Sequence, residues 1–166
     1  MAAGPEFMRP MRATETAAVE ALLQTAFGGP QEATLVRALR AEGRMELEMV
    51  LPWGEGVAGY LALSRLVAPE GWLALAPVAI APPWQGQRWG TRLVTAVRRL
   101  TEIKGQTVVV LGKPSFYSRC GFSSSRAAGL TSPYPLHHTL ISGPRTDSPT
   151  DNPSQTLIYP TAFQGV

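Results

Sequence analysis

Residues 75–122 constrain the fold of this chain more than any other segment. An apolar strand pattern over residues 72–80 leads into a glycine-containing turn, and an amphipathic pattern follows over residues 90–104. A second apolar run, residues 107–111, consists of β-branched residues and leucine, which is typical of a strand buried on both faces. A strand, a helix and a second strand in this order favour a right-handed crossover between parallel strands. The segment therefore predicts an α/β fold.

The helix expected at residues 90–104 has a charged face and an apolar face, and we expect the apolar face to be buried. That face consists of Leu93, Ala96, Val97, Leu100 and Ile103. Backbone N–H groups in the first turn of a helix lack partners, and the helix dipole favours negative charge there. The turn before this helix is therefore a candidate anion site.

The flanking patterns predict antiparallel strands and further helices around this unit. Expected strands cover residues 8–13, 44–51, 57–67, 136–141 and 157–159, with a hairpin turn at residues 53–56. Expected helices cover residues 15–27 behind an N-cap at Thr14, residues 32–42, and residues 114–120. The polar, proline-rich residues 142–156 are expected to form a long exposed loop. Together these patterns predict one mixed, mostly antiparallel twisted sheet with helices on both faces.

Length and composition exclude several classes of protein. The 166 residues suit a single domain, which we expect to span residues 8–166, because residues 1–7 resemble an expression-tag scar. No apolar run approaches the roughly 20 residues that a membrane-spanning helix needs. A net charge of +3 with 16% charged residues falls well short of a nucleic-acid-binding surface. The single cysteine favours a cytoplasmic location.

Three short motifs point to a known family. Residues 84–90 read WQGQRWG, residues 116–122 read FYSRCGF, and residues 159–163 read YPTAF. The chain resembles the GNAT family of acetyl-CoA-dependent N-acyltransferases, and most of all its YhbS-like bacterial branch. The resemblance implies a GNAT fold, in which two central parallel strands splay apart in a V shape. It also implies acetyl-CoA as cosubstrate and an amine as acceptor, and no Cys/His cluster has the spacing of a metal site.

The resemblance assigns the turn at residues 85–90 to the pyrophosphate of coenzyme A. Gln85 matches the first position of the family pattern Gln/Arg-x-x-Gly-x-Gly/Ala and Gly90 matches the last, but Arg88 replaces the middle glycine. If the φ angle of Arg88 is negative, we expect its N–H to donate to phosphate, and its guanidinium can add a charge-assisted contact. The alternative is a degenerate turn with weak affinity.

Pro77 lies inside the first apolar strand, where a proline cannot donate to the sheet. In the GNAT fold the pantetheine arm lies between the splayed strands, and the resemblance implies that the backbone of Val78 and Ile80 pairs with its amides. An ordinary bulge at Pro77 is the alternative. The cofactor-binding residues that the resemblance implies are Val78, Ala79, Ile80, Gln85, Gly86, Gln87, Arg88, Trp89, Gly90, Thr91, Ser115 and Tyr117.

Tyr117 is the catalytic residue that the resemblance implies. In many GNAT enzymes a tyrosine at this place protonates the departing thiolate of coenzyme A. A phenol with an ordinary pKa near 10 is a reasonable acid toward a thiolate with a pKa of about 8.5 or higher. The alternative is a tyrosine that packs against Phe116 and Phe122 with its hydroxyl satisfied.

No general base is visible, because the strand expected at residues 72–80 carries no carboxylate. The candidates are Glu46, Glu48, Glu70, His137 and His138, and a reaction through water is an equal alternative. If the two histidines lie on a strand, they point to opposite faces.

The cysteine and the tryptophans have plain structural explanations. Cys120 has no histidine near it in the sequence, so we expect a buried small hydrophobe rather than a nucleophile. Trp72 is expected in the core. Trp84 and Trp89 flank the turn, and we expect them to pack in the core or at an interface rather than to cover the adenine.

Three functions remain open at this point, and the third of them is a GNAT fold that no longer binds coenzyme A at all. The first is an active N-acetyltransferase, in which the amine attacks the thioester directly in a ternary complex. The second is an acyl-CoA-binding or protein-interaction module without turnover, which Arg88, Lys113 and the missing base motivate. Only the first predicts release of the free thiol when an amine is present. An exposed apolar strand near the C-terminus is compatible with a homodimer.

Overall fold

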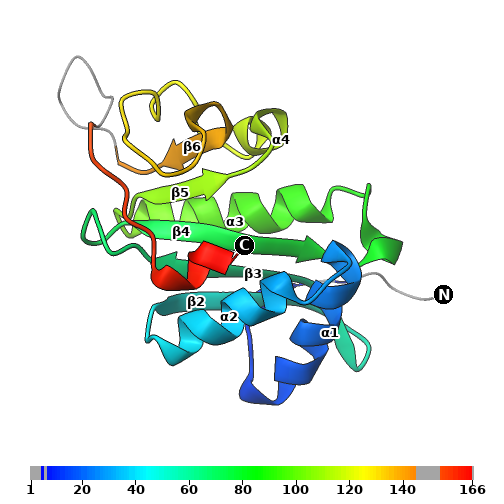
Figure 1. Ribbon diagram of the computed structural model, residues 1–166. Coiled ribbons are helices and arrows are strands. Elements are labelled where there is room, and N and C mark those ends of the chain that lie inside the picture. The colour runs from blue at the N-terminus through cyan, green and yellow to red at the C-terminus, as the bar shows by residue number, and fades with distance from the viewer. Residues whose placement is uncertain (1–4, 6, 145–153, 166) are drawn as a thin grey trace.

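A six-stranded sheet forms the centre of the computed structural model, which describes residue 5, residues 7–144 and residues 154–165 (Figure 1). Its strands, in spatial order, are β1 (Arg9–Pro10), β2 (Met45–Trp53), β3 (Gly56–Arg65), β4 (Leu73–Ile80), β5 (Val108–Leu111) and β6 (Thr139–Ser142). Only β4 and β5 pair in parallel; the other neighbours are antiparallel. The helices are α1 (Thr16–Phe27), α2 (Gln31–Ala41), α3 (Trp89–Ile103) and α4 (Pro114–Arg119). The mixed, mostly antiparallel sheet that the sequence predicts is confirmed.

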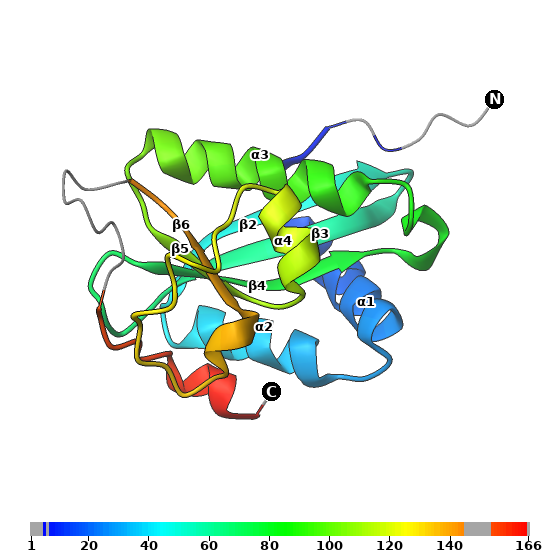
Figure 2. The same ribbon diagram turned by 90° about the horizontal axis from the view of Figure 1, so that it is seen from above.

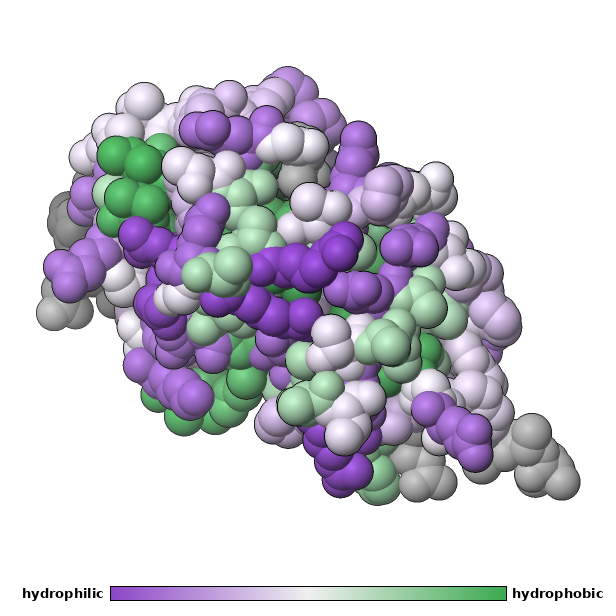
Figure 3. Space-filling model, turned by 60° about the horizontal axis from the view of Figure 1, so that its bottom comes forward, coloured by the Kyte–Doolittle hydropathy of each residue, from purple (hydrophilic) through white to green (hydrophobic). Residues whose placement is uncertain are grey.

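Helices cover both faces of the sheet (Figure 2). On one face, Leu93 and Val97 of α3 pack with Phe122, which follows α4. On the other face lie α1, α2 and the C-terminal turn Thr161–Gly165. The side that α1 and α2 present to solvent mixes hydrophilic side chains with separate apolar patches, as expected of amphipathic helices (Figure 3). None of the described helices is long and apolar enough to span a bilayer.

The two parallel strands separate soon after they meet. They pair from Leu73 opposite Val108 to Leu75 opposite Val110. Beyond Leu75, β4 continues to Ile80 without pairing with β5. We call this gap the strand opening. It confirms the V-shaped splay that the resemblance implies.

A β-bulge in β4 lies at the start of the strand opening. Leu75 and Val78 both pair with β3, and between them β4 holds Ala76 and Pro77 where β3 holds only Ala62. The extra residue reverses the alternation of side chains, so that Leu75 and Val78 both pack on the α3 side of the sheet. Pro77 lies where the ladder is already interrupted, which is how a strand accommodates a residue that cannot donate.

The C-terminal strand predictions are partly wrong. His137 and His138 belong to a short 3-10 turn, Leu136–His138, and β6 begins only at Thr139. Residues 157–159 form no strand of the sheet: Ile158 makes an isolated bridge to Ala68, because its neighbours there are loops. Residues 145–153 of the expected long loop lie outside the described residues.

Two helix details also differ from expectation. Thr14 is not an N-cap, since a 3-10 turn over Ala13–Glu15 precedes α1 and the Glu15 carboxylate accepts the Arg12 N–H at 2.8 Å. Ile103 is 85% exposed rather than buried, because the buried positions of α3 shift around the helix axis along its length and no longer include the face of Ile103. Those buried positions are Leu93, Val94, Val97 and Thr101.

Replacing Glu15 is expected to lower stability at neutral pH and to have a much smaller effect at pH 2. Its carboxylate accepts two bonds from the Arg9 guanidinium, at 2.8 and 2.7 Å, and this pairing lowers the pKa of Glu15 to about 2. A depressed folded-state pKa stabilises the fold above the unfolded value of about 4.3, and the gain disappears as the pH falls toward 2. Urea unfolding of Glu15→Gln and the parent chain at pH 7 and pH 2 measures this. Equal destabilisation at both pH values would contradict it.

Candidate active site

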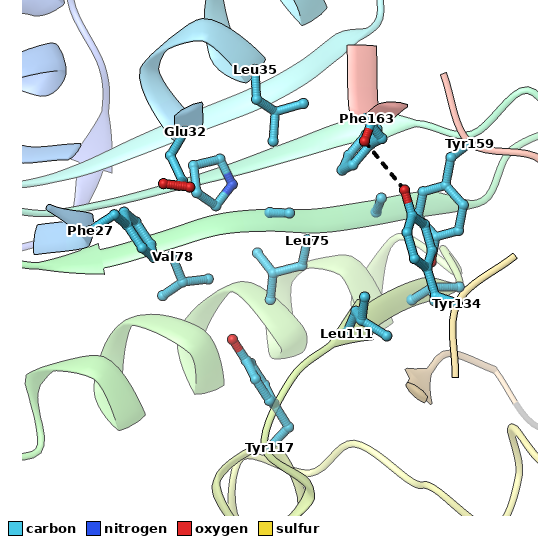
Figure 4. A pocket seen from close by; sticks show the side chains of 14 residues that line it. Phe27, Glu32, Leu35, Leu75, Val78, Leu111, Tyr117, Tyr134, Tyr159 and Phe163 are labelled. Carbon is cyan, nitrogen blue, oxygen red and sulfur yellow. Dashed lines mark hydrogen bonds between the residues drawn. The ribbon is translucent and has the colours of Figure 1, made fainter. Parts of the chain in front are cut away.

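A cavity of about 280 Å³ lies at the strand opening (Figure 4). Its floor is the part of β4 around the bulge, and its walls come from α1, α2, β5, α4 and the C-terminal segment. The residues that line it are Phe27, Glu32, Leu35, Ala74, Leu75, Ala76, Pro77, Val78, Val109, Leu111, Tyr117, Tyr134, Tyr159 and Phe163. Of the expected site residues, the structure brings Val78 and Tyr117 together here.

Tyr117 extends from α4, and its hydroxyl points toward Val78 and Leu75 (Figure 4). The ring packs edge-on against Phe116 at 4.9 Å and Phe122 at 6.0 Å between centroids. A Cβ on Gly112 would come within 2.5 Å of the ring, so this glycine allows the close approach. Burial raises the pKa of Tyr117 to about 12, with a smaller contribution from Cys120. The phenol is therefore a neutral donor at the strand opening.

The edge of β4 that faces the strand opening makes no ladder with β5 beyond Leu75. The Ala81 N–H donates to the Ala58 carbonyl of β3 at 2.8 Å. Because backbone groups alternate along a strand, those of Val78 and Ile80 face away from β3. The Gln85 side chain donates to the Ile80 carbonyl at 2.8 Å, which ties the following turn to this strand. Ala79, by contrast, pairs with β3 and buries its side chain against α1.

The turn before α3 has two residues in the left-handed conformation, Gly86 at a φ of 75° and Arg88 at a φ of 68°. The negative φ on which we based phosphate donation by Arg88 is therefore wrong. An arginine in this conformation carries a backbone cost of about 1–2 kcal/mol. The turn requires it here because the residue immediately before α3 must reverse the chain into the helix. Arg88 thus adopts a conformation that glycine reaches without this cost.

A basic hollow lies beside this turn, lined by Gly86, Arg88, Thr91 and Arg119. Thr91 belongs to the first turn of α3, where backbone N–H groups lack helical partners. Arg119 ends α4 and comes from a distant part of the sequence, so no local pattern could have placed it here. Two guanidinium groups and a helix N-terminus together favour a phosphate-bearing ligand.

Comparisons with known proteins agree with this geometry. Residues 46–124 match the family model described as an acetyltransferase (GNAT) domain. The uncharacterized N-acetyltransferase YhbS of Escherichia coli is 38% identical over 109 residues, which cover 63% of this chain and 65% of that relative. The chain contains a GNAT acetyltransferase domain. The match spans just under two thirds of YhbS, and the extent of a single domain over residues 8–166 stays a prediction.

Two solved GNAT structures have the same fold as this chain. The crystal structure of YhbS from Escherichia coli in complex with CoA has a TM-score of 0.83 and 27% identity, and covers 95% of this chain and 91% of its own. A GNAT acetyltransferase from Brucella melitensis in complex with acetyl-CoA has a TM-score of 0.76 and 25% identity, and covers 95% of this chain and 97% of its own. The GNAT fold expected for this chain is therefore confirmed.

None of the five candidate bases is among the residues that line the cavity of this GNAT chain. Glu48 accepts hydrogen bonds from the Tyr60 hydroxyl and the Arg40 guanidinium, both at 2.6 Å, and so serves the fold. The other four candidates, Glu46, Glu70, His137 and His138, also lie outside that lining. The cavity instead contains Glu32, from the first turn of α2. Sequence reasoning missed it because it looks like an ordinary residue of an amphipathic helix.

The remaining expected residues of this GNAT chain lie around the turn. Trp84 packs edge-on against Trp53 at 5.0 Å, and Trp89 lies 6.5 Å from Trp84. All three tryptophans are half-buried, so they pack with one another at the surface rather than in the core. Cys120 is buried, as expected, and burial raises its thiol pKa. Ser115 is exposed in the first turn of α4.

Proposed function

We propose that the protein is an acetyl-CoA-dependent N-acyltransferase that transfers an acetyl group to a primary amine in a ternary complex. The observation that carries the proposal is the cavity through the strand opening, which places a neutral phenol beside the free edge of β4. The basic hollow at the start of α3 also supports the proposal, because it could bind the phosphates of the cosubstrate. Both relatives of known structure are described as complexes with CoA or acetyl-CoA.

The cosubstrate would be held by two regions of the chain. Backbone N–H groups of the turn at residues 85–90 and the first turn of α3 would bind its pyrophosphate, with Arg88 and Arg119 adding charge. The outward backbone groups of Val78 and Ile80 would bind the pantetheine amides and polarise the thioester carbonyl. Preorganised backbone donors stabilise the charge that develops on such an oxygen.

Tyr117 would act as the general acid. The neutral amine, which forms when the ammonium loses one proton to water, bonds to the acetyl carbon while the carbon–sulfur bond breaks, and the N-protonated amide that results loses its second proton to water. The departing thiolate takes the phenolic proton of Tyr117, which solvent later restores. Burial raises the pKa of this phenol to about 12, and the same exclusion of water makes a thiolate beside it more basic. The remaining rate enhancement comes from holding both substrates together.

Calorimetric titration with acetyl-CoA, followed by a thiol-release assay with a panel of primary amines, tests the proposed function. We expect binding in the micromolar range and thiol release that depends on an amine. Binding without release for any amine would show a binding module. No binding at millimolar acetyl-CoA would overturn the proposal. A cytoplasmic location, which the buried thiol of Cys120 suits, and a homodimer stay predictions.

A further inference from the structure

The cavity has a distinctive chemistry that bears on the acceptor. Of the described residues that line it, Glu32 alone carries a formal charge at neutral pH. Burial raises the pKa of the Tyr134 and Tyr159 phenols, so both remain neutral. The rest of the lining is aliphatic, aromatic or proline. The cavity therefore offers one negative charge in apolar surroundings.

Glu32 and the cluster formed by Tyr134, Tyr159 and Phe163 lie at different ends of the cavity (Figure 4). Glu32 lies beside Phe27, above Val78, at the end toward which the Tyr117 hydroxyl points. Its carboxylate stands in the first turn of α2, where the helix dipole favours negative charge. A cationic nitrogen drawn to Glu32 would thus lie near the free edge of β4.

An aromatic wall closes the other end. Tyr159 packs edge-on against Tyr134 at 4.9 Å and Phe163 at 5.2 Å between centroids. The Tyr134 hydroxyl donates to the Phe163 carbonyl at 3.4 Å, so its polar end is turned to the protein backbone. The ring faces and edges of these three side chains that border the cavity suit an apolar or aromatic group.

Tyr117 and Glu32 approach the strand opening from opposite faces of the sheet. Tyr117 packs with the α3 core, whereas the Glu32 helix and the aromatic wall belong to the α2 side. The basic hollow also lies with α3 and α4, since α3 and α4 supply its threonine and one of its arginines. The α2 side of the opening is therefore free for the acceptor when the cosubstrate occupies the α3 side.

We propose that the acceptor is a small monoamine with an apolar or aromatic body, whose ammonium pairs with Glu32 and whose body lies against Tyr134, Tyr159 and Phe163. This inference rests on the proposed function. The whole cavity, whose lining includes Val78 at the edge assigned to the cosubstrate, measures about 280 Å³, which is just below the range of about 300 to 1,000 Å³ for small-molecule pockets, so the acceptor must be small. A second ammonium or a carboxylate on the ligand would find no partner among the described lining residues, and an unpaired buried charge is costly.

Three amines test the proposed class in the thiol-release assay at saturating acetyl-CoA. 2-Phenylethylamine carries one ammonium and an aromatic ring, L-phenylalanine adds a carboxylate, and putrescine replaces the ring by a second ammonium. We expect kcat/KM for 2-phenylethylamine to exceed both others by about 100-fold, because each of the others leaves a charge unpaired. Acetylation of putrescine, phenylalanine or a peptide amine at an equal or greater rate would overturn the inference and leave the proposed function standing.

Glu32→Gln keeps the shape of the side chain and removes its charge. We expect KM for 2-phenylethylamine to rise about 10- to 100-fold, because one charge-assisted contact is lost. The Kd for acetyl-CoA should stay unchanged. Glu20→Gln is the matched control: it removes the same charge from α1, where Glu20 pairs with Arg37 at 3.4 Å outside the cavity. An unchanged KM in a folded Glu32→Gln protein would show that Glu32 does not pair with the ammonium of the acceptor. If no amine releases thiol, the proposed function fails and this inference fails with it.

Discussion

Tyr117→Phe is expected to lower kcat by about 100-fold or more while the Kd for acetyl-CoA changes little. The substitution removes only the hydroxyl, and loss of a positioned general acid typically costs about 100- to 10,000-fold. Among the described residues no side chain or backbone group bonds to this hydroxyl, so its removal leaves no partner unsatisfied. The ring keeps its packing against Phe116 and Phe122. Steady-state thiol release and calorimetry separate the two effects.

Tyr60→Phe supplies the matched control for this prediction. Tyr60 is also a buried phenol, but its hydroxyl donates to Glu48 in the network with Arg40, and none of these three residues lines the cavity. We expect it to lose stability and to keep kcat. Because burial raises the pKa of Tyr117 to about 12, the acid stays protonated in alkaline solution, and the parent kcat should not fall as the pH rises from neutral to about 10. A kcat within threefold of the parent in Tyr117→Phe would make Tyr117 a packing residue.

Local patterns in the sequence were sufficient for most of the fold. The amphipathic helices, the hairpin between β2 and β3 and the crossover through α3 each follow from periodicity and turn residues within one segment. The strand opening was different, since no local pattern shows where two parallel strands stop pairing. It came from the family resemblance, and the structure confirms it.

The bulge in β4 shows where periodicity alone fails. Strict alternation would place Leu75 and Val78 on opposite faces, but the extra residue at Ala76–Pro77 puts both on the α3 side. Pro77 suggested an interruption, and an ordinary bulge was one of the two explanations that the sequence left open. Only the register against β3 decides how many residues the interruption contains.

The candidate site was predictable where it is local and not where it is assembled from distant segments. The turn before α3 and Tyr117 lie within motifs that can be read along the chain. Glu32 comes from α2, outside any motif, and Arg119, although it lies in the same motif as Tyr117, reaches the basic hollow only because α4 packs beside the start of α3. The positive φ angle of Arg88 could not be predicted from the sequence either, because a non-glycine residue rarely adopts it.

The double substitution Arg88→Gly with Arg119→Ala is expected to weaken acetyl-CoA binding by about 100-fold or more. Each guanidinium in the basic hollow would make a charge-assisted contact with phosphate, typically about 1.5–3 kcal/mol. Glycine at position 88 removes the side chain and preserves the left-handed backbone, so the turn itself keeps its shape. Calorimetric titration in low salt measures the Kd.

Acetyl-pantetheine, which lacks the phosphates, makes this experiment selective. The parent and the double variant should bind it equally, because the outward edge of β4 is unchanged. Arg99→Ala, compared with Arg88→Gly and Arg119→Ala as single variants, is the control for the loss of one positive charge, since Arg99 is exposed on α3 and does not line the hollow. If Arg88→Gly alone binds acetyl-CoA more tightly than the parent, the backbone cost of the arginine exceeds its contact with phosphate. In that case Arg119 and the helix N-terminus hold the nucleotide, and Arg88 is tolerated rather than used.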